Sequence, residues 1–226
     1  MRRWLRIISA AVILLCTVQL IQYVLSYKSV ENELTDAKQV VEENTFTTLQ
    51  QQNANITGWL SLANSRLDNP VMQTDNNEFY LMHNYLDEKS RGGSIFVDYR
   101  NEPMKDRHTI FYGHVLRNGT MFGELSKFAE QQYADEHPVF IYETASEKYE
   151  LQVFAAYETT TDFYYIETQF SDVTFEQFLT EIQQRSEIMM PVDVSVNDRI
   201  ITFSTCTTSA NDKERFVVHA KIVNGT

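Results

Sequence analysis

Cysteine is scarce in this sequence of 226 residues, and familiar metal and cofactor motifs are missing. Only Cys16 and Cys206 occur, so an intramolecular disulfide requires both residues to reach one compartment. There is no HExxH motif, no CxxC pair and no other ligand cluster, so nothing supports a required metal. The P-loop and the Gly-rich dinucleotide fingerprint are also missing. We therefore expect no cofactor.

Runs of basic residues are missing as well. The formal net charge is −12 at pH 7, and all 31 acidic residues but only 16 of the 19 basic residues follow residue 26. Binding to nucleic-acid phosphates requires a positive patch. A nucleic-acid partner is therefore not expected, and the acidic excess indicates solubility of this part of the chain.

One long apolar run is present near the N-terminus. Residues 7–25 are apolar apart from four polar positions, which approaches the ~20 residues that cross a bilayer as a helix. Three arginines within residues 1–6 favour a cytoplasmic N-terminus. A cleaved signal peptide is the alternative, but the run is long for one and no small-x-small cleavage site follows. The sequence predicts a transmembrane signal-anchor at 7–25, with the rest of the chain outside the cell.

Residues 27–57 indicate a stalk or an N-terminal helix, because most of this segment is polar and acidic, contains neither Gly nor Pro between residues 30 and 52, and has apolar residues at helical spacing. From residue 58 to 226 the pattern changes to short apolar strands separated by polar turns. The predicted strands span 94–99, 109–114, 139–144, 149–160, 199–206 and 215–223. Such a series is typical of a closed β-barrel, in a single mainly β domain with helices.

One segment of this domain has helical rather than strand periodicity. Residues 174–188 carry apolar side chains at positions i, i+3, i+4 and i+7. These side chains belong to Phe175, Phe178, Leu179 and Ile182. The pattern predicts a helix inserted between two strands.

Cys206 ends the predicted strand 199–206 and precedes a loop-like run. With Cys16 in a membrane span, Cys206 is the one exported thiol and has no intramolecular disulfide partner. A buried structural cysteine, an intermolecular bridge and a reactive nucleophile remain open. Its position at a strand end favours the nucleophile, because functional side chains concentrate where strands pass into loops.

A nucleophilic cysteine needs a nearby cation or base, since a free thiol is mostly protonated at neutral pH. Among five histidines, His114 ends the predicted strand 109–114 and precedes a turn, the same placement as Cys206. Arg215 starts the strand after the cysteine loop, where a permanent positive charge could stabilise an oxyanion. Spacing alone does not show that these three residues meet.

The segment TFSTC, residues 202–206, followed by Arg215, resembles the sortase signature TLxTC followed by Arg. Phe203 stands where the signature has Leu, an apolar change of the same kind. Longer blocks resemble class B sortases in family order and cover most of the exported chain. They are GWLSLANSRLDNPVMQ, EFYLMHNYLDEKSRGGSIFVDYRN, TIFYGHVLRNGTMFGEL, YELQVFAAYETTTDFYYIETQF and DRIITFSTC. This resemblance implies an eight-stranded sortase barrel with N-terminal helices and a helix between strands 6 and 7.

The resemblance also implies an activity, that of a membrane-anchored cysteine transpeptidase of Gram-positive bacteria. Its partners would be secreted surface proteins with a C-terminal sorting signal of NPxTN type, cleaved after Thr, and a peptidoglycan precursor or cross-bridge amine. Cys206 would form a thioacyl intermediate, and His114 would act as general acid and base. Arg215 would hold the substrate backbone and stabilise the oxyanion.

Matching of the same blocks assigns a further set of positions to the substrate groove. They are Asn77, Leu81, Tyr112, Thr161, Tyr165, Ile166 and Ser204. Several of these side chains suit a barrel interior equally well. Two other functions stay open: a class B-like pilin polymerase that uses a lysine as acceptor, and a non-enzymatic surface binding domain on a membrane stalk.

Overall fold

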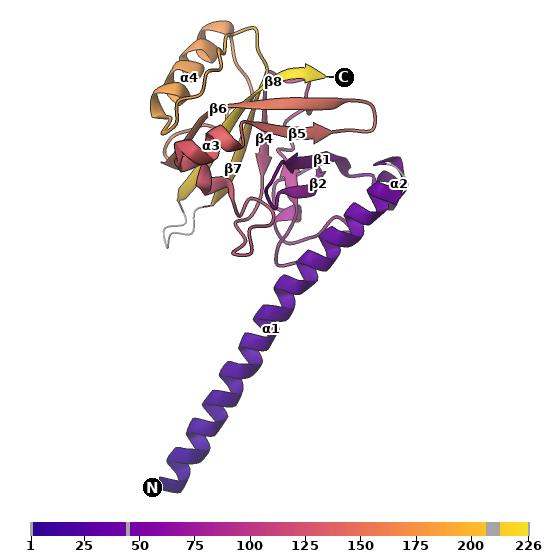
Figure 1. Ribbon diagram of the computed structural model, residues 1–226, viewed down its shortest axis with the longest axis vertical. Coiled ribbons are helices and arrows are strands. Elements are labelled where there is room, and N and C mark those ends of the chain that lie inside the picture. The colour runs from indigo at the N-terminus through magenta and orange to yellow at the C-terminus, as the bar shows by residue number, and fades with distance from the viewer. Residues whose placement is uncertain (1, 44–45, 207–212, 226) are drawn as a thin grey trace.

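The computed structural model describes residues 2–43, 46–206 and 213–225. A long helix leads into a barrel of strands (Figure 1). The barrel closes in the order β1-β2-β3-β4-β7-β8-β6-β5. Its strands are β1 (Ile56–Leu62), β2 (Asp68–Met72), β3 (Ile95–Val97), β4 (His108–Tyr112), β5 (Val139–Glu143), β6 (Lys148–Thr160), β7 (Ile200–Cys206) and β8 (Glu214–Gly225). The predicted fold class, a closed eight-stranded barrel with helices, is confirmed.

The helices lie before the barrel and in the connections between its strands. They are α1 (Arg2–Glu43), α2 (Phe46–Gln52), α3 (Gln131–Glu136) and α4 (Asp172–Arg185), with single 3-10 turns η1 (Phe79–Leu81) and η2 (Leu125–Ala129). Among the described residues, one helix is long and apolar enough to cross a membrane, the Arg6–Val41 part of α1. Its apolar window has a mean hydropathy of 2.1 and none of it is buried.

The two halves of α1 differ in their surroundings. The N-terminal half extends away from the barrel (Figure 1). Further along, Val30 and Ala37 are buried, and Lys38 forms an ion pair with Asp68 on β2. The C-terminal half of α1 is therefore packed against the barrel rather than standing free of it.

Six of the eight strands lie within two residues of their predicted ends, whereas β1 and β2 were not predicted. Both contain residues that are uncommon in strands: Gly58 in β1 and Pro70 in β2. Gly58 is needed because a Cβ atom there would lie 2.3 Å from the ring of Tyr142. Pro70 lies opposite Trp59 on β1, and β2 pairs with β3 only beyond the proline. Because Gly58 and Pro70 interrupt the apolar pattern, the sequence periodicity did not predict these two strands.

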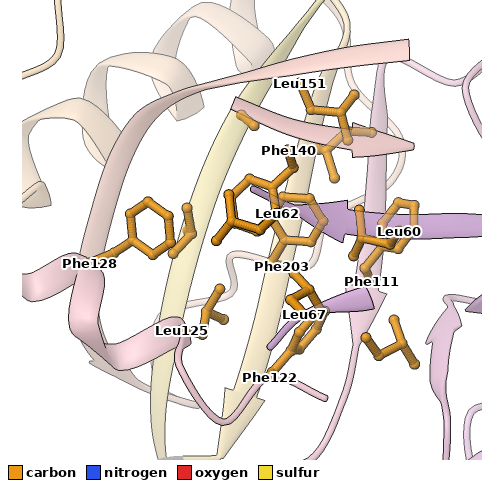
Figure 2. Packing of buried hydrophobic residues seen from close by; sticks show 14 of the residues in the cluster. Leu60, Leu62, Leu67, Phe111, Phe122, Leu125, Phe128, Phe140, Leu151 and Phe203 are labelled. Carbon is orange, nitrogen blue, oxygen red and sulfur yellow. The ribbon is translucent and has the colours of Figure 1, made fainter. Parts of the chain in front are cut away.

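Aromatic rings fill the barrel interior (Figure 2). Phe203 on β7 is fully buried, and its ring centroid lies 4.4 Å from that of Phe140 and 5.5 Å from that of Phe111. Burying a side chain of this size contributes about 1.5–3 kcal/mol. Phe203 stands where the sortase signature has Leu. Because its side chain is buried in the core, this difference affects core packing and not the rim of the barrel.

The helix between β6 and β7 is α4, which starts two residues before the predicted segment 174–188 and ends three residues before its end. It begins at Asp172 because Ser171 and Thr174 form a capping box, in which each side chain accepts the backbone N–H of the other residue. All four predicted apolar side chains are buried against β6, β7 and β8. The inserted helix is therefore confirmed.

Candidate active site

One end of the barrel brings together the C-terminal ends of β4 and β7 and the start of β8. β4 and β7 are parallel, and Tyr112 lies opposite Ser204. Because parallel strands run in the same direction, His114 and Cys206 each follow two residues further along. β7 and β8 are antiparallel, and Cys206 lies opposite Arg215. Strand register therefore brings the backbone of all three predicted catalytic residues to the same end of the barrel.

A groove of about 320 Å³ opens at this end. Its lining includes His114, Arg215 and all seven side chains that the resemblance assigns to the substrate. Those seven are Asn77, Leu81, Tyr112, Thr161, Tyr165, Ile166 and Ser204. The side chain of Cys206 lies outside what the structure describes, although its neighbour Thr205 lines the groove.

Three lining residues were not predicted: Phe96, Gly113 and Thr205. Gly113 and Thr205 directly precede His114 and Cys206, so sequence proximity could have identified both. Phe96 lies within a predicted strand, where the apolar pattern indicates burial but not which end of the barrel the side chain borders.

His114 lies two residues after Tyr112, the last residue of β4, and is half-buried. Its Nε2 lies 2.7 Å from the backbone oxygen of Leu81. A carbonyl oxygen can only accept a hydrogen bond, so Nε2 carries a proton and donates it. Nδ1 is therefore the ring nitrogen that can take up or release a proton. The preceding Gly113 donates its N–H to the oxygen of Ser204 at 3.4 Å, which holds this turn against β7.

The opposite wall of the groove comes from the connection after β6. Tyr165 OH lies 2.8 Å from Ser204 Oγ, and both side chains are buried. This hydrogen bond joins the connection to β7. Arg215, at the start of β8, is half-buried and donates from Nη1 to the oxygen of Glu214 at 2.8 Å. Its guanidinium places a permanent charge at the groove.

A buried carboxylate that was not predicted lies behind the groove. Asp98 is fully buried, and its Oδ2 accepts hydrogen bonds from Tyr112 OH at 2.9 Å and Asn77 Nδ2 at 3.0 Å. Burial raises the pKa of Asp98, but hydrogen bonds from Arg100 and Tyr112 outweigh it and leave that pKa below its usual range. Burial also raises the pKa of Tyr112, so its hydroxyl remains a neutral donor. In the segment SIFVDYR the carboxylate directly follows the apolar strand and stands two residues before an arginine, and this spacing is the signal that could have identified the pair.

The other four histidines do not line the groove. His83 and His137 each place Nδ1 within hydrogen-bond distance of a backbone oxygen, 2.8 Å from Phe79 and 2.9 Å from Tyr133. Each also stacks on the ring of that same residue. Within the described residues, no group of three or more His, Cys, Asp or Glu side chains is placed to hold a metal ion.

Thr202, the first residue of the signature, joins the two remaining histidines. Its Oγ1 lies 2.5 Å from His108 Nε2 and 2.8 Å from His219 Nδ1. His108 Nδ1 donates to the oxygen of Glu167 at 2.6 Å, and Tyr157 OH lies 2.8 Å from His219 Nε2. Burial lowers the pKa of His108 to about 4 and that of His219 well below its ordinary value. Both imidazoles are therefore neutral, and the chain of hydrogen bonds satisfies their nitrogens inside the fold.

Three comparisons bear on the identity of this barrel. A family model described as Sortase domain matches residues 62–223. Sortase B of Listeria monocytogenes is 42% identical over 214 residues, 87% of each chain. The structure of sortase B from Bacillus anthracis in complex with AAEK1 matches with a TM-score of 0.82 at 36% identity and covers 88% of this chain and 99% of that one. A Staphylococcus aureus sortase B–substrate complex matches with a TM-score of 0.77 at 36% identity, covering 87% and 94%.

All these matches are sortases, which are cysteine transpeptidases built on this barrel. The chain belongs to the sortase family, in the sortase B class. It is therefore an enzyme of the kind that anchors surface proteins, acting on proteins with a sorting signal and on a cell-wall amine. The alternative of a non-enzymatic binding domain is excluded.

Proposed function

We propose that this chain is a membrane-anchored transpeptidase that cleaves a C-terminal sorting signal of NPxTN type after Thr and joins the new C-terminus to an amino group of peptidoglycan. One observation supports this most strongly. His114 and Arg215 line one groove together with all seven side chains matched to the substrate, at the end of the barrel where β7 reaches Cys206.

In the first step Cys206 is the nucleophile. Its thiolate attacks the carbonyl carbon of the sorting-signal Thr, which forms a C–S bond and a tetrahedral intermediate. The C–N bond to the next residue then breaks. His114, protonated at both nitrogens, gives the Nδ1 proton to the leaving amine and keeps the Nε2–H bond to Leu81. The products are a thioester on Cys206 and the released C-terminal peptide.

In the second step an amine of the cell wall attacks the thioester carbon. The now neutral Nδ1 of His114 removes a proton from the amine, the C–S bond breaks and an amide forms. The thiolate of Cys206 and the imidazolium of His114 are restored together. Water in place of the amine would give simple hydrolysis by the same route.

Arg215 stabilises the charge that develops on the Thr oxygen in both tetrahedral intermediates. A guanidinium stays charged and offers several N–H donors in a planar fork, so it can hold an oxyanion and a substrate carbonyl together. Its place opposite Cys206 on the neighbouring strand supports this role.

The groove selects the sorting signal by a mixture of polar and apolar side chains. Asn77 and Tyr112 offer hydrogen-bonding groups, whereas Leu81 and Ile166 offer apolar contact. This mixture suits a short extended peptide that begins with Asn and Pro. The similar structure from S. aureus is a sortase B–substrate complex, which supports substrate binding by the barrel that this chain shares.

Residues 7–25 of α1 anchor the enzyme in the membrane, with residues 1–6 in the cytoplasm and the barrel outside the cell of a Gram-positive bacterium. The exposed apolar surface of this part of α1 supports the anchor. The basic residues that precede it support the orientation.

Mass spectrometry of the full-length chain in detergent micelles tests this function. The chain is mixed with NPxTN-type peptides, with and without a glycine peptide as acceptor amine. We expect cleavage after Thr, a thioester adduct on Cys206, and a new amide product when the amine is present. Replacement of the peptide Thr by Val provides the control. A peptide set that leaves the cysteine unacylated would contradict the proposal, and transfer to a pilin lysine alone would favour the polymerase.

A further inference from the structure

We propose that Asp98 and Arg100 are positioning residues that hold the two walls of the groove in one arrangement and thereby set the affinity for the sorting signal. The inference rests on the proposed function, because the arrangement of the walls matters for affinity only if a peptide binds between them. Neither residue lines the groove itself, so both act through the side chains and backbone that do.

Asp98 holds the first wall of the groove, which is the side that contains Asn77 and Tyr112. It follows directly after β3, and its backbone N–H donates to the oxygen of Ile110 at 2.9 Å. Its carboxylate accepts from Asn77 and Tyr112, which both line the groove. Since the carboxylate is fully buried, its removal would break both of these hydrogen bonds inside the protein.

Arg100 connects Asp98 to the second wall of the groove, which is the connection after β6 that contains Ile166. Its Nε donates to Oδ1 of Asp98 at 2.9 Å and its Nη2 to Oδ2 at 2.8 Å, a bidentate pair. The same Nη2 donates to the backbone oxygen of Ile166 at 2.9 Å, and Nη1 donates to Tyr164 OH at 3.1 Å. Ile166 lines the groove and belongs to the connection after β6. One guanidinium therefore links the buried carboxylate to the opposite wall.

The second wall needs such a link because it is a loop. Residues 161–170 contain neither helix nor strand, and loops move more than the elements that they connect. Charge-assisted hydrogen bonds are about twice as strong as neutral ones, and the fork of Arg makes several of them at fixed angles. The pair therefore restricts how far Ile166 can move from Tyr112, which defines the width of the peptide site.

Arg100→Lys in the full-length chain tests the inference. Lysine keeps the charge, but a single ammonium cannot bind both carboxylate oxygens and also reach Ile166 and Tyr164. We expect the KM for the sorting peptide to rise about tenfold while kcat stays within about twofold, because the pair affects binding and not the reacting atoms. Labelling of Cys206 by a small thiol reagent should stay within about twofold of the parent rate.

Arg66→Lys is a matched control. Nη1 of Arg66 also binds one carboxylate, Glu31 at 3.2 Å, and one backbone oxygen, that of Asn118 at 2.7 Å. None of these residues lines the groove. Arg66→Lys should therefore leave both KM and kcat at the parent values.

Asp98→Asn is the second variant. It keeps the shape of the side chain but replaces an acceptor oxygen by a donor that faces Arg100. We expect at least the same rise in KM and a lower Tm. If this variant does not fold, Arg100→Lys still decides the outcome.

An unchanged KM in Arg100→Lys would overturn the inference. This holds also if kcat and thiol labelling fall in parallel, because such a fall at constant KM indicates only less folded protein. A parent enzyme that turns over no sorting peptide would instead refute the proposed function, and this inference with it. If the parent is fully active and Arg100→Lys has the same KM, the inference is refuted but the proposed function stands.

Discussion

Two histidines, one at the start of β4 and one two residues beyond its end, have different surroundings. His108 is the first residue of the strand, is fully buried, and shares a hydrogen bond with Thr202 of β7. His114 lies two residues after the last residue of the strand and lines the groove together with Ser204, which is also on β7. The paired strands β4 and β7 therefore have a buried histidine at one end and a histidine that lines the groove at the other.

The chemistry available to an imidazole therefore depends on its surroundings and not on residue type alone. Desolvation holds His108 neutral, with a pKa of about 4, and both of its nitrogens have partners inside the fold. His114 is half-buried, and a backbone oxygen engages its Nε2. The first arrangement suits stability, whereas the second suits proton transfer to a substrate.

The largest effect expected at the groove end follows from Cys206→Ala. Removal of the thiol removes the proposed acyl acceptor, so cleavage of every sorting peptide should be abolished. We expect little change in Tm, because Cys206 is the last residue of β7. Peptide turnover and thermal unfolding measure the two effects. Retention of a tenth or more of the parent activity would refute the assignment.

His114→Ala tests the comparison of the two histidines directly. Loss of a general acid and base lowers turnover by about 10²–10⁴-fold, and we expect this fall in kcat without a change in Tm. His83→Ala and His137→Ala are controls that should keep parent turnover. In His219→Ala, turnover should fall only in proportion to the folded fraction, and a fall as large as that of His114→Ala would show that the wrong imidazole was assigned.

The buried histidines should respond to pH through stability. Burial lowers the pKa of His108 from 6.5 to about 4, so between these values the unfolded chain binds a proton that the folded chain does not. Stability should therefore be full above pH 6.5 and fall as the pH drops toward 4, by roughly 3 kcal/mol for this group. Urea unfolding at several pH values measures this.

A matched variant separates the two histidines in the same experiment. His114→Ala should keep the fall in stability between pH 6.5 and 4, because His108 and His219 stay buried in this variant. A stability that stays flat in this range would contradict the assignment of His108 as a buried neutral residue.

The smallest of these effects is expected for Arg215→Lys. Lysine keeps the charge but loses the planar fork, so kcat/KM should fall tenfold or more, about 1.4 kcal/mol in transition-state stabilisation. Alkylation of Cys206 forms no oxyanion, so thiol labelling should stay within a few-fold of the parent. If labelling falls together with turnover, Arg215 instead controls the ionisation of the cysteine.

The sequence predicted the barrel because most of its strands alternate or run apolar between clear turns, and it predicted α4 from one apolar face. It did not reveal β1 and β2, where Gly58 and Pro70 interrupt the strand pattern. Gly58 makes way for the ring of Tyr142 on β5. Local pattern cannot report a requirement that a distant strand imposes.

The amino-acid sequence was sufficient to predict the apolar N-terminal run, six strands, the inserted helix and the signature that ends in Cys206, because each of these is a local pattern. The folded structure was needed to show that Asp98 and Arg100 join the walls of the groove through Asn77 and Ile166. These residues lie far apart along the chain. Their contacts depend on strand register and loop packing, which emerge only when the whole barrel closes.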